Sequence, residues 1–275
     1  MFASGPQEGW EAARPDRGPT PGPNPTLVNN VETLANVPHI LARGAAWFRT
    51  MGTTESPGNV VATIVGDTQH AGVGEIELGT PLRDVIAGIG GGVGAGRSVK
   101  AVFSGVANPV VTAADLDVPV SYEGMAAIGS GMGAAGFIVY DDTACMVDAA
   151  YRVSRFLSVE SCGQCPPCKI GSSEITNALE RVETGTGGDA DLAAIQGWLL
   201  RVTDGSRCSL AVEEQVMVSS ILRAFPDEFA EHIDHHGCPR PGRRPIPKLV
   251  DIVDGEAIYD ERFWRKRPDW TYRDA

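Results

Sequence analysis

The chain has 275 residues, 33 of them glycine, and a formal net charge of −12 at pH 7. Its hydrophobic content of 43% is ordinary for a folded protein and excludes a collagen-like or wholly disordered chain, while its length predicts one large or two to three small domains. The acidic balance disfavours nucleic acid as a partner, and the longest uncharged stretch, residues 124–140, is too short and too rich in glycine to insert into a membrane as a helix.

The first part of the chain predicts an arm followed by a helical segment. Residues 1–26 contain six prolines and four glycines, a composition that predicts an extended arm over residues 1–24. Apolar residues then recur at helical spacing, and Thr26, Asn29 or Asn30 can cap the start of the helix. We therefore expect a helical linker over residues 25–58.

Residues 59–118 have the order of elements of a β-grasp, ubiquitin-like domain. Two strands, a short helix and a third strand are predicted at residues 60–65, 73–78, 82–89 and 100–103. A connector over residues 119–142 follows this domain and contains one more predicted strand, at residues 137–140.

The next part of the chain is predicted to be helical. Four helices are expected, at residues 144–158, 169–182, 190–202 and 211–224. Because each has one apolar face to bury, they predict a small all-α four-helix bundle, within a domain that spans residues 143–233. The fold class is therefore α+β, with the β-grasp domain followed by the bundle.

Residues 234–275 form a basic and aromatic C-terminal tail. The aromatic and basic residues near its end are Tyr259, Arg262, Phe263, Trp264, Arg265, Lys266, Arg267, Trp270 and Tyr272. Such a pattern can stack on nucleic acid, but the acidic body disfavours this. We expect the tail to pack on its own bundle or on an acidic partner subunit, because exposed aromatic side chains need covering.

The cysteines carry the strongest functional signal. Cys162, Cys165 and Cys168 lie at two-residue gaps, and Cys208 follows forty residues after Cys168. Such a triple run with a distant fourth cysteine is typical of Cys₄ ligation of an iron–sulfur cluster. A structural zinc site, which pairs two separated C-x₂-C hairpins, is the alternative, as are inert thiols. Lys169 either favours the reduced cluster by its charge or is an ordinary surface lysine.

Cys145 and a histidine-rich segment offer further candidate ligands. Cys145, near the start of an apolar helix, is expected to be buried packing. His232, His235, His236 and Cys238 could form a second metal site, but we favour a solvated exit of the chain from the bundle.

Three segments resemble one protein family. They are ESCGQCPPCKIG at residues 160–171 with Cys208 downstream, NNVETLANVP at residues 29–38 and CMVDA at residues 145–149. They are similar to the flavoprotein, NADH-dehydrogenating subunit of respiratory complex I and to the related subunits of NAD-linked hydrogenases and formate dehydrogenases. The resemblance covers about residues 25–238 in collinear order.

The resemblance implies a helical linker, a β-grasp domain of the SLBB type and a helical domain with one [4Fe-4S] cluster. The family's four cluster ligands correspond to Cys162, Cys165, Cys168 and Cys208. The family's FMN- and NADH-binding domain, with a loop like GRGGAGFPTG, has no counterpart in this sequence. Asn29 and Asn30 alone match residues at the edge of the FMN site, so we expect FMN only where a flavin domain is supplied in trans.

The sequence thus predicts an electron-transfer subunit or fragment of an NADH dehydrogenase-type complex, without an NADH or FMN catalytic domain of its own. It would relay electrons between a flavin and another iron–sulfur centre, with the flavin and iron–sulfur subunits of that complex as partners. Residues 1–23 contain no apolar segment of a secretory signal, so the expected location is the cytoplasm, including the periphery of a membrane complex. A non-redox assembly module with zinc or an empty site is the alternative function.

Overall fold

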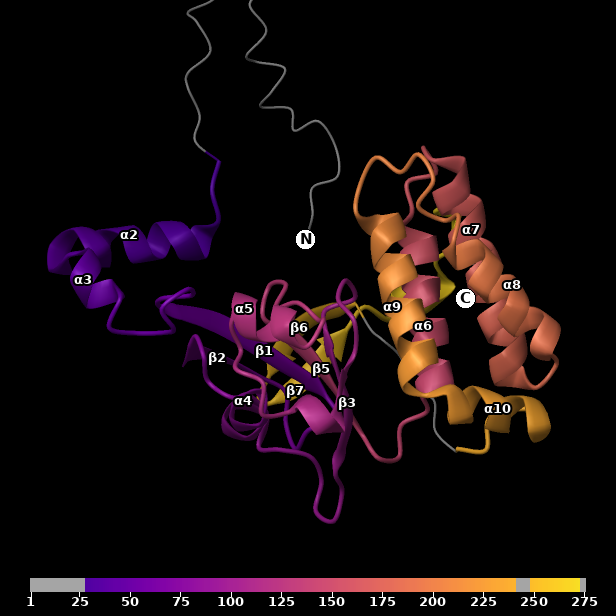
Figure 1. Ribbon diagram of the computed structural model, residues 1–275, viewed down its shortest axis with the longest axis horizontal. Helices are drawn as coiled ribbons and strands as arrows, with labels where there is room; N and C mark the ends of the chain where they lie inside the picture. Colours follow the sequence, from indigo (N-terminus) through magenta and orange to yellow (C-terminus); the bar gives the residue numbers. More distant parts are fainter. Residues whose placement is uncertain (1–27, 241–247, 273–275) are drawn as a thin grey trace, which may run out of the picture. The chain divides into compact units, whose positions relative to one another are not determined.

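The computed structural model describes residues 28–240 and 248–272. The chain divides into two units, Met1–Phe48 and Arg49–Ala275. The first contains α2 (Val31–Arg43) and α3 (Ala45–Phe48) (Figure 1). Asn30 caps α2, since its side chain accepts a 2.7 Å hydrogen bond from the backbone N–H of Glu32, as expected for an Asn at a helix start. The predicted arm, residues 1–24, lies outside the described residues.

The second unit begins with a five-stranded sheet. Its strands are β1 (Asn59–Gly66), β2 (Gly72–Glu77), β3 (Val99–Ser104), β4 (Val111–Thr112) and β5 (Gly136–Asp141). Their order across the sheet is β2-β1-β5-β3-β4, in which β1 and β5 are parallel and the other neighbours are antiparallel. The strand that the sequence places in a connector, β5, is therefore the central strand.

Two short helices accompany the sheet, and they are α4 (Leu82–Gly90) and α5 (Tyr122–Ala127). The first ends at Gly91, which adopts the left-handed conformation that glycine tolerates. The second was not predicted. It begins at Ser121, whose side chain accepts a hydrogen bond from the backbone N–H of Gly124.

The central strands contribute to two hydrophobic cores. On β3, Val102 packs with the sheet and its short helices, whereas Ala101 and Phe103 pack with the helices that follow. On β5, Phe137 belongs to the first core and Tyr140 to the second. Because successive side chains of a strand point to opposite faces, each of these strands joins the sheet to the helical part of the unit.

The helical part has five helices where four were predicted. They are α6 (Met146–Glu160), α7 (Pro166–Thr184), α8 (Asp189–Leu199), α9 (Leu210–Ala224) and α10 (Pro226–Asp234) (Figure 1). The additional helix, α10, starts directly after α9 at Pro226, a residue suited to the first helical position.

The prediction of an α+β fold is confirmed. Within the described residues, no helix combines the length and apolar character needed to cross a bilayer.

The C-terminal tail packs on the helices of its own chain. This is one of the two outcomes that the sequence predicts for the tail. The hairpin of β6 (Leu249–Val253) and β7 (Glu256–Tyr259) is followed by η2 (Glu261–Arg265). Phe263 is buried with its ring 5.6 Å from that of Phe156 on α6. The Arg155 guanidinium donates to the backbone carbonyls of Trp264 and Lys266, both at 3.1 Å. Tail residues 241–247 and 273–275 lie outside the described residues.

Gly185 at the end of α7 allows the chain after α10 to approach closely. Its φ is +77°, and a Cβ at this position would collide with the backbone carbonyl of His236. We expect Gly185→Ala to lower the free energy of unfolding by about 2 kcal/mol or more, because left-handed strain alone costs about 1–2 kcal/mol. Urea unfolding measures this loss.

Gly105→Ala is the matched control for this substitution. Gly105 also has a positive φ, +63°, but a Cβ there meets nothing within 4 Å. The control should therefore show the conformational cost without the collision. Equal losses in the two variants would mean that the contact between Gly185 and His236 contributes nothing to stability.

Candidate functional site

The predicted cysteine run lies where α6 passes into α7. Cys162 is in the connecting loop, Cys165 is the N-cap of α7, and Cys168 is in the first turn of that helix. The two prolines between these last two cysteines occupy the first helical positions, where proline is tolerated because the N–H would be unpaired in any case. The sequence therefore places the three thiols around one helix N-terminus.

The fourth predicted ligand is at the start of another helix. Cys208 directly precedes Ser209, the N-cap of α9. The side chains of Cys165 and Cys168 are buried, whereas Cys162 and Cys208 are exposed. Half of the thiol set thus lies inside the helical part and half lies open to solvent.

The environment of Cys168 links the four thiols. Burial raises the pKa of the Cys168 thiol, the hydrogen bond with the Ser161 hydroxyl opposes this, and the neighbouring thiols of Cys208, Cys165 and Cys162 raise the pKa further. The Ser161 oxygen lies 3.5 Å from the Cys168 sulfur. Cys208 therefore acts on the same site as the three clustered cysteines, although it is forty residues away in the sequence.

The helix ends provide positive potential for anionic sulfur. The N-terminus of a helix carries a partial positive charge, which stabilises a thiolate. Both Cys165 and Cys208 lie at such an end, of α7 and α9 respectively. A cluster bound by four thiolates is anionic, so these helix ends favour it electrostatically.

Lys169 is fixed beside the cysteine loop instead of extending freely into solvent. Its ammonium donates to the carbonyls of Ser158, at 3.1 Å, and Ser161, at 3.0 Å. It also lies 5.5 Å from the centre of the Trp270 ring. Burial lowers the pKa of Lys169, and the thiols of Cys168 and Cys162 act against that decrease. Its charge is thus held at the end of α6, close to the thiols.

A second set of side chains, separate from the four predicted cysteines, is arranged so that it can hold a single ion. Within the described residues, one group of three or more donor side chains is placed to hold one metal ion, and its members are Cys145, Glu183, His232 and Cys238.

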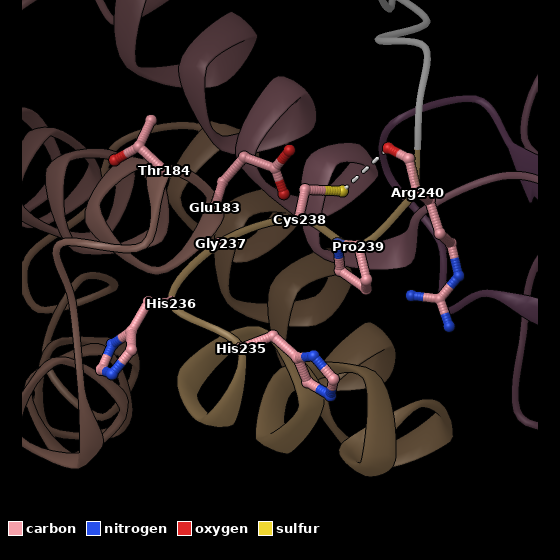
Figure 2. A pocket seen from close by; sticks show the side chains of 8 residues that line it. All are labelled: Glu183, Thr184, His235, His236, Gly237, Cys238, Pro239 and Arg240. Carbon is pink, nitrogen blue, oxygen red and sulfur yellow. Dashed lines mark hydrogen bonds between the residues drawn. The ribbon is translucent and has the colours of Figure 1, made fainter.

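The expectation of a solvated exit from the bundle is wrong for His232. This side chain has no exposed surface, because α10 packs it against α6 and α7, whereas His235 and His236 are exposed. Figure 2 shows both exposed histidines pointing away from Glu183 and Cys238. Sequence reasoning included His232 and Cys238 as candidates but missed Glu183, and it assigned Cys145 to packing alone. No local spacing could have found this group, since its members span residues 145–238.

Comparison with known proteins identifies the helical part. Residues 148–232 match the family model described as the NADH-ubiquinone oxidoreductase-F iron-sulfur binding region. Over 217 residues the chain is 38% identical to an NADH-quinone oxidoreductase chain of Rhizobium meliloti, and the match covers 78% of this chain and 52% of that protein. It is 39% identical over 216 residues to the NADP-reducing hydrogenase protein HndC of Solidesulfovibrio fructosivorans, covering 78% of this chain and 44% of that protein.

Two solved structures of a hydrogenase are also similar to this chain. A crystal structure of an NAD⁺-reducing [NiFe]-hydrogenase in the H₂-reduced state is similar with a TM-score of 0.65 and 28% identity, over 79% of this chain and 36% of that chain. The air-oxidised state gives a TM-score of 0.67 and 26% identity, over 86% of this chain and 38% of that chain. The chain spans about half the length of the curated relatives it matches.

Proposed function

Residues 148–232 are an iron–sulfur binding region of the NADH-ubiquinone oxidoreductase-F type, and from this premise we propose that the chain is an electron-transfer module. It relays electrons between a flavin and another iron–sulfur centre through one [4Fe-4S] cluster. The observation that carries the proposal is the position of Cys162, Cys165 and Cys168 at the start of α7 with Cys208 at the start of α9.

The donor chemistry fits this cofactor. Four cysteines are the ligand set of a [4Fe-4S] cluster, which supplies one-electron chemistry when it is bound. Cys162, Cys165, Cys168 and Cys208 would hold it, and their shared effect on the pKa of Cys168 supports their grouping. The described part of the chain has no disulfide at these positions, so all four sulfurs are free to bind.

The protein's own contribution to electron transfer is electrostatic and structural. The buried thiols of Cys165 and Cys168 hold one side of the site away from water. The exposed thiols of Cys162 and Cys208 leave the other side open to a redox partner. The helix ends and the anchored charge of Lys169 favour the more negative, reduced state, which raises the reduction potential relative to a site without them.

The finer description of the fold belongs to this proposal. The strand order β2-β1-β5-β3-β4, with β1 parallel to β5, supports a β-grasp domain of the SLBB type. The packing of α6, α7, α8 and α9 supports a four-helix bundle as the cluster-binding domain, with α10 added to it. We propose the boundaries 25–58, 59–118, 119–142, 143–233 and 234–275 for the linker, β-grasp domain, connector, cluster domain and tail.

The partners follow from the relatives. Because components of NADH-quinone oxidoreductases and of hydrogenases are similar to this chain, we propose that it works in a multi-subunit redox complex, in the cytoplasm or at the periphery of a membrane. The flavin would reside on another polypeptide or on another part of a longer chain. Asn29 and Asn30, both exposed, are the residues that would meet the edge of that FMN.

Metal and sulfide analysis of the full chain, purified without oxygen, tests the proposal. We expect about four iron and about four acid-labile sulfide per chain, as a [4Fe-4S] cluster requires. Reduction with dithionite should produce a paramagnetic state in electron paramagnetic resonance, and reoxidation should remove it. Protein without iron and sulfide, even after reconstitution with ferrous iron and sulfide, would instead support the non-redox assembly module.

A further inference from the structure

Four donor side chains meet at the end of the helical part that is opposite to the predicted cluster. Cys145 precedes α6, Glu183 is in the last turn of α7, His232 is on α10, and Cys238 is in the segment that follows α10. Their ligand atoms all lie within 4.8 Å of one another. Glu183 follows Cys168 by fifteen positions on α7, which separates the two sites by about 22 Å along the helix.

The imidazole of His232 is oriented so that its Nε2 atom is directed at the other donors and can bind an ion. Its Nδ1 lies 2.6 Å from the backbone carbonyl of Glu228, which can only accept, so Nδ1 carries the proton in this bond. Its Nε2 lies 3.1 Å from Oε2 of Glu183 and 3.2 Å from Sγ of Cys145. A ring N–H bonded to a backbone carbonyl, with the other nitrogen directed at further donors, is the arrangement found around metal-bound histidines.

The group brings together in a buried place two thiols and a carboxyl group, which become negatively charged when they lose their protons. Cys145, Glu183 and His232 are buried, and Cys238 is half-buried. Burial is the main cause that raises the pKa of both thiols, and the Glu183 carboxylate raises them further. The nearby cation Arg240 is engaged with Glu228, at 3.4 Å, and with Glu231, at 2.7 Å.

A relay for nucleophilic catalysis does not fit this geometry. In a catalytic triad the acidic residue binds the ring nitrogen that is remote from the nucleophile. Here the carboxylate of Glu183 and the thiol of Cys145 both approach Nε2 of His232, while Nδ1 is taken by the backbone. The side chains converge on a common centre, as the ligands of an ion do.

The donor set selects the type of ion. Two sulfurs, one imidazole nitrogen and one carboxylate oxygen suit zinc, whereas calcium and magnesium require oxygen ligands. Zinc–sulfur bonds of about 2.3 Å place two sulfur ligands about 4 Å apart in a tetrahedron. The observed separations, up to 4.8 Å, need only a small contraction to reach this arrangement.

The site is open to solvent on one side. Glu183 and Cys238 line a cavity of about 590 Å³, whose other walls include His235, His236 and Arg240. Figure 2 shows the side chains of Glu183 and Cys238 at this cavity, with the Cys238 thiol directed at the Arg240 carbonyl, 3.3 Å away. An ion can therefore reach two of the four donors from solvent.

We propose that Cys145, Glu183, His232 and Cys238 bind one zinc ion, which joins the segment after α10 to the ends of α6 and α7. Binding releases the thiol protons, as zinc–thiolate ligation requires. The site is separate in space and in ligands from the four cluster cysteines, and it goes beyond the electron-transfer function.

Zinc analysis and zinc K-edge X-ray absorption on the anaerobically purified full chain test the proposal. We expect about one zinc per chain, with two sulfur neighbours at about 2.3 Å and two lighter neighbours at about 2.0–2.2 Å. Cys238→Ser should weaken zinc binding by more than about tenfold, since even the loss of an outer-shell partner costs 10–100-fold. The iron and sulfide content of this variant should stay unchanged.

His235→Ala is the matched control, because His235 lies three residues from Cys238 but points away from it. This variant should keep its zinc. The proposal is overturned by protein that binds no zinc, by zinc with four sulfur neighbours (which would place it at the cluster cysteines), or by a Cys145–Cys238 disulfide in the anaerobic protein. Equal zinc loss in the two variants would overturn it as well. Because iron and sulfide are measured on the same sample, failure of the zinc site is distinguished from failure of the cluster.

Discussion

Cys208→Ala is expected to remove the cluster almost completely, from about four iron per chain to less than about one. Cys208 is the one predicted ligand outside the run at the start of α7, and it is exposed before the N-cap of α9. Without it, one iron has no protein thiolate and the site is open to water on that side. Iron and sulfide assays and the electron paramagnetic resonance signal of the reduced protein measure the loss.

Cys238→Ser is the control for a cysteine outside the cluster, and it should retain the full iron content. Cys208→Ala should also retain its helices, because its side chain is exposed and contributes nothing to the hydrophobic core. Far-ultraviolet circular dichroism checks this. A folded Cys208→Ala protein with all of its iron would show that Cys208 is not a ligand.

Glu214 on α9 is a buried carboxyl group inside the cluster-binding helices. Its side chain is fully buried, and burial raises its pKa to about 8, although the hydrogen bond with Ser154 lowers it. Oε1 lies 2.6 Å from the Ser154 hydroxyl, while Oε2 has no partner among the described residues. An ionised carboxylate in this position would have, of the residues that the structure describes, only the Ser154 hydroxyl to offset its loss of hydration.

A chain of hydroxyl groups explains how the neutral acid is accommodated. Thr176 donates to the carbonyl of Ser172 at 2.7 Å, and its oxygen lies 2.7 Å from that of Ser154. If Ser154 donates to Thr176, its contact with Glu214 needs a proton from the carboxyl group. A protonated Glu214 thus completes the chain, whereas an ionised Glu214 would compete with Thr176 for the single proton of Ser154.

Replacing this acid by its neutral analogue should make stability less dependent on pH. The pKa is raised in the folded state, so the stabilisation from Glu214 is complete below about pH 4.5 and is lost as the pH rises to about 8. Each pH unit in this window costs about 1.4 kcal/mol at most. We expect Glu214→Gln to match the unchanged protein at pH 5 and to exceed it by a few kcal/mol at pH 8 in urea unfolding.

Glu174→Gln is the control for the loss of one carboxylate, since Glu174 lies on the exposed side of α7. It should leave the slope of stability against pH unchanged. If Glu214→Gln also leaves this slope unchanged between pH 5 and pH 8, then Glu214 is ionised in the folded protein at neutral pH.

The local features of the fold were predictable where a short stretch of sequence dictates them. The β-branched run in β1, the glycine after α4 and the prolines at the start of α7 each act over a few residues, and their elements were predicted. The central place of β5 was not, because it depends on pairing with β1 and β3, which come from distant parts of the sequence. The helix α10 was missed because it begins two residues after α9 ends.

The candidate sites divide in the same way. The spacing of Cys162, Cys165 and Cys168 is local, so the sequence by itself predicts an iron–sulfur ligand pattern, and through its resemblance it determined the family. The group of Cys145, Glu183, His232 and Cys238 was decided only by the tertiary structure, because its members lie on separate elements and meet where α6, α7 and α10 pack together. Spacing along a chain encodes ligands that share one loop, whereas packing alone brings together donors that are nearly a hundred residues apart.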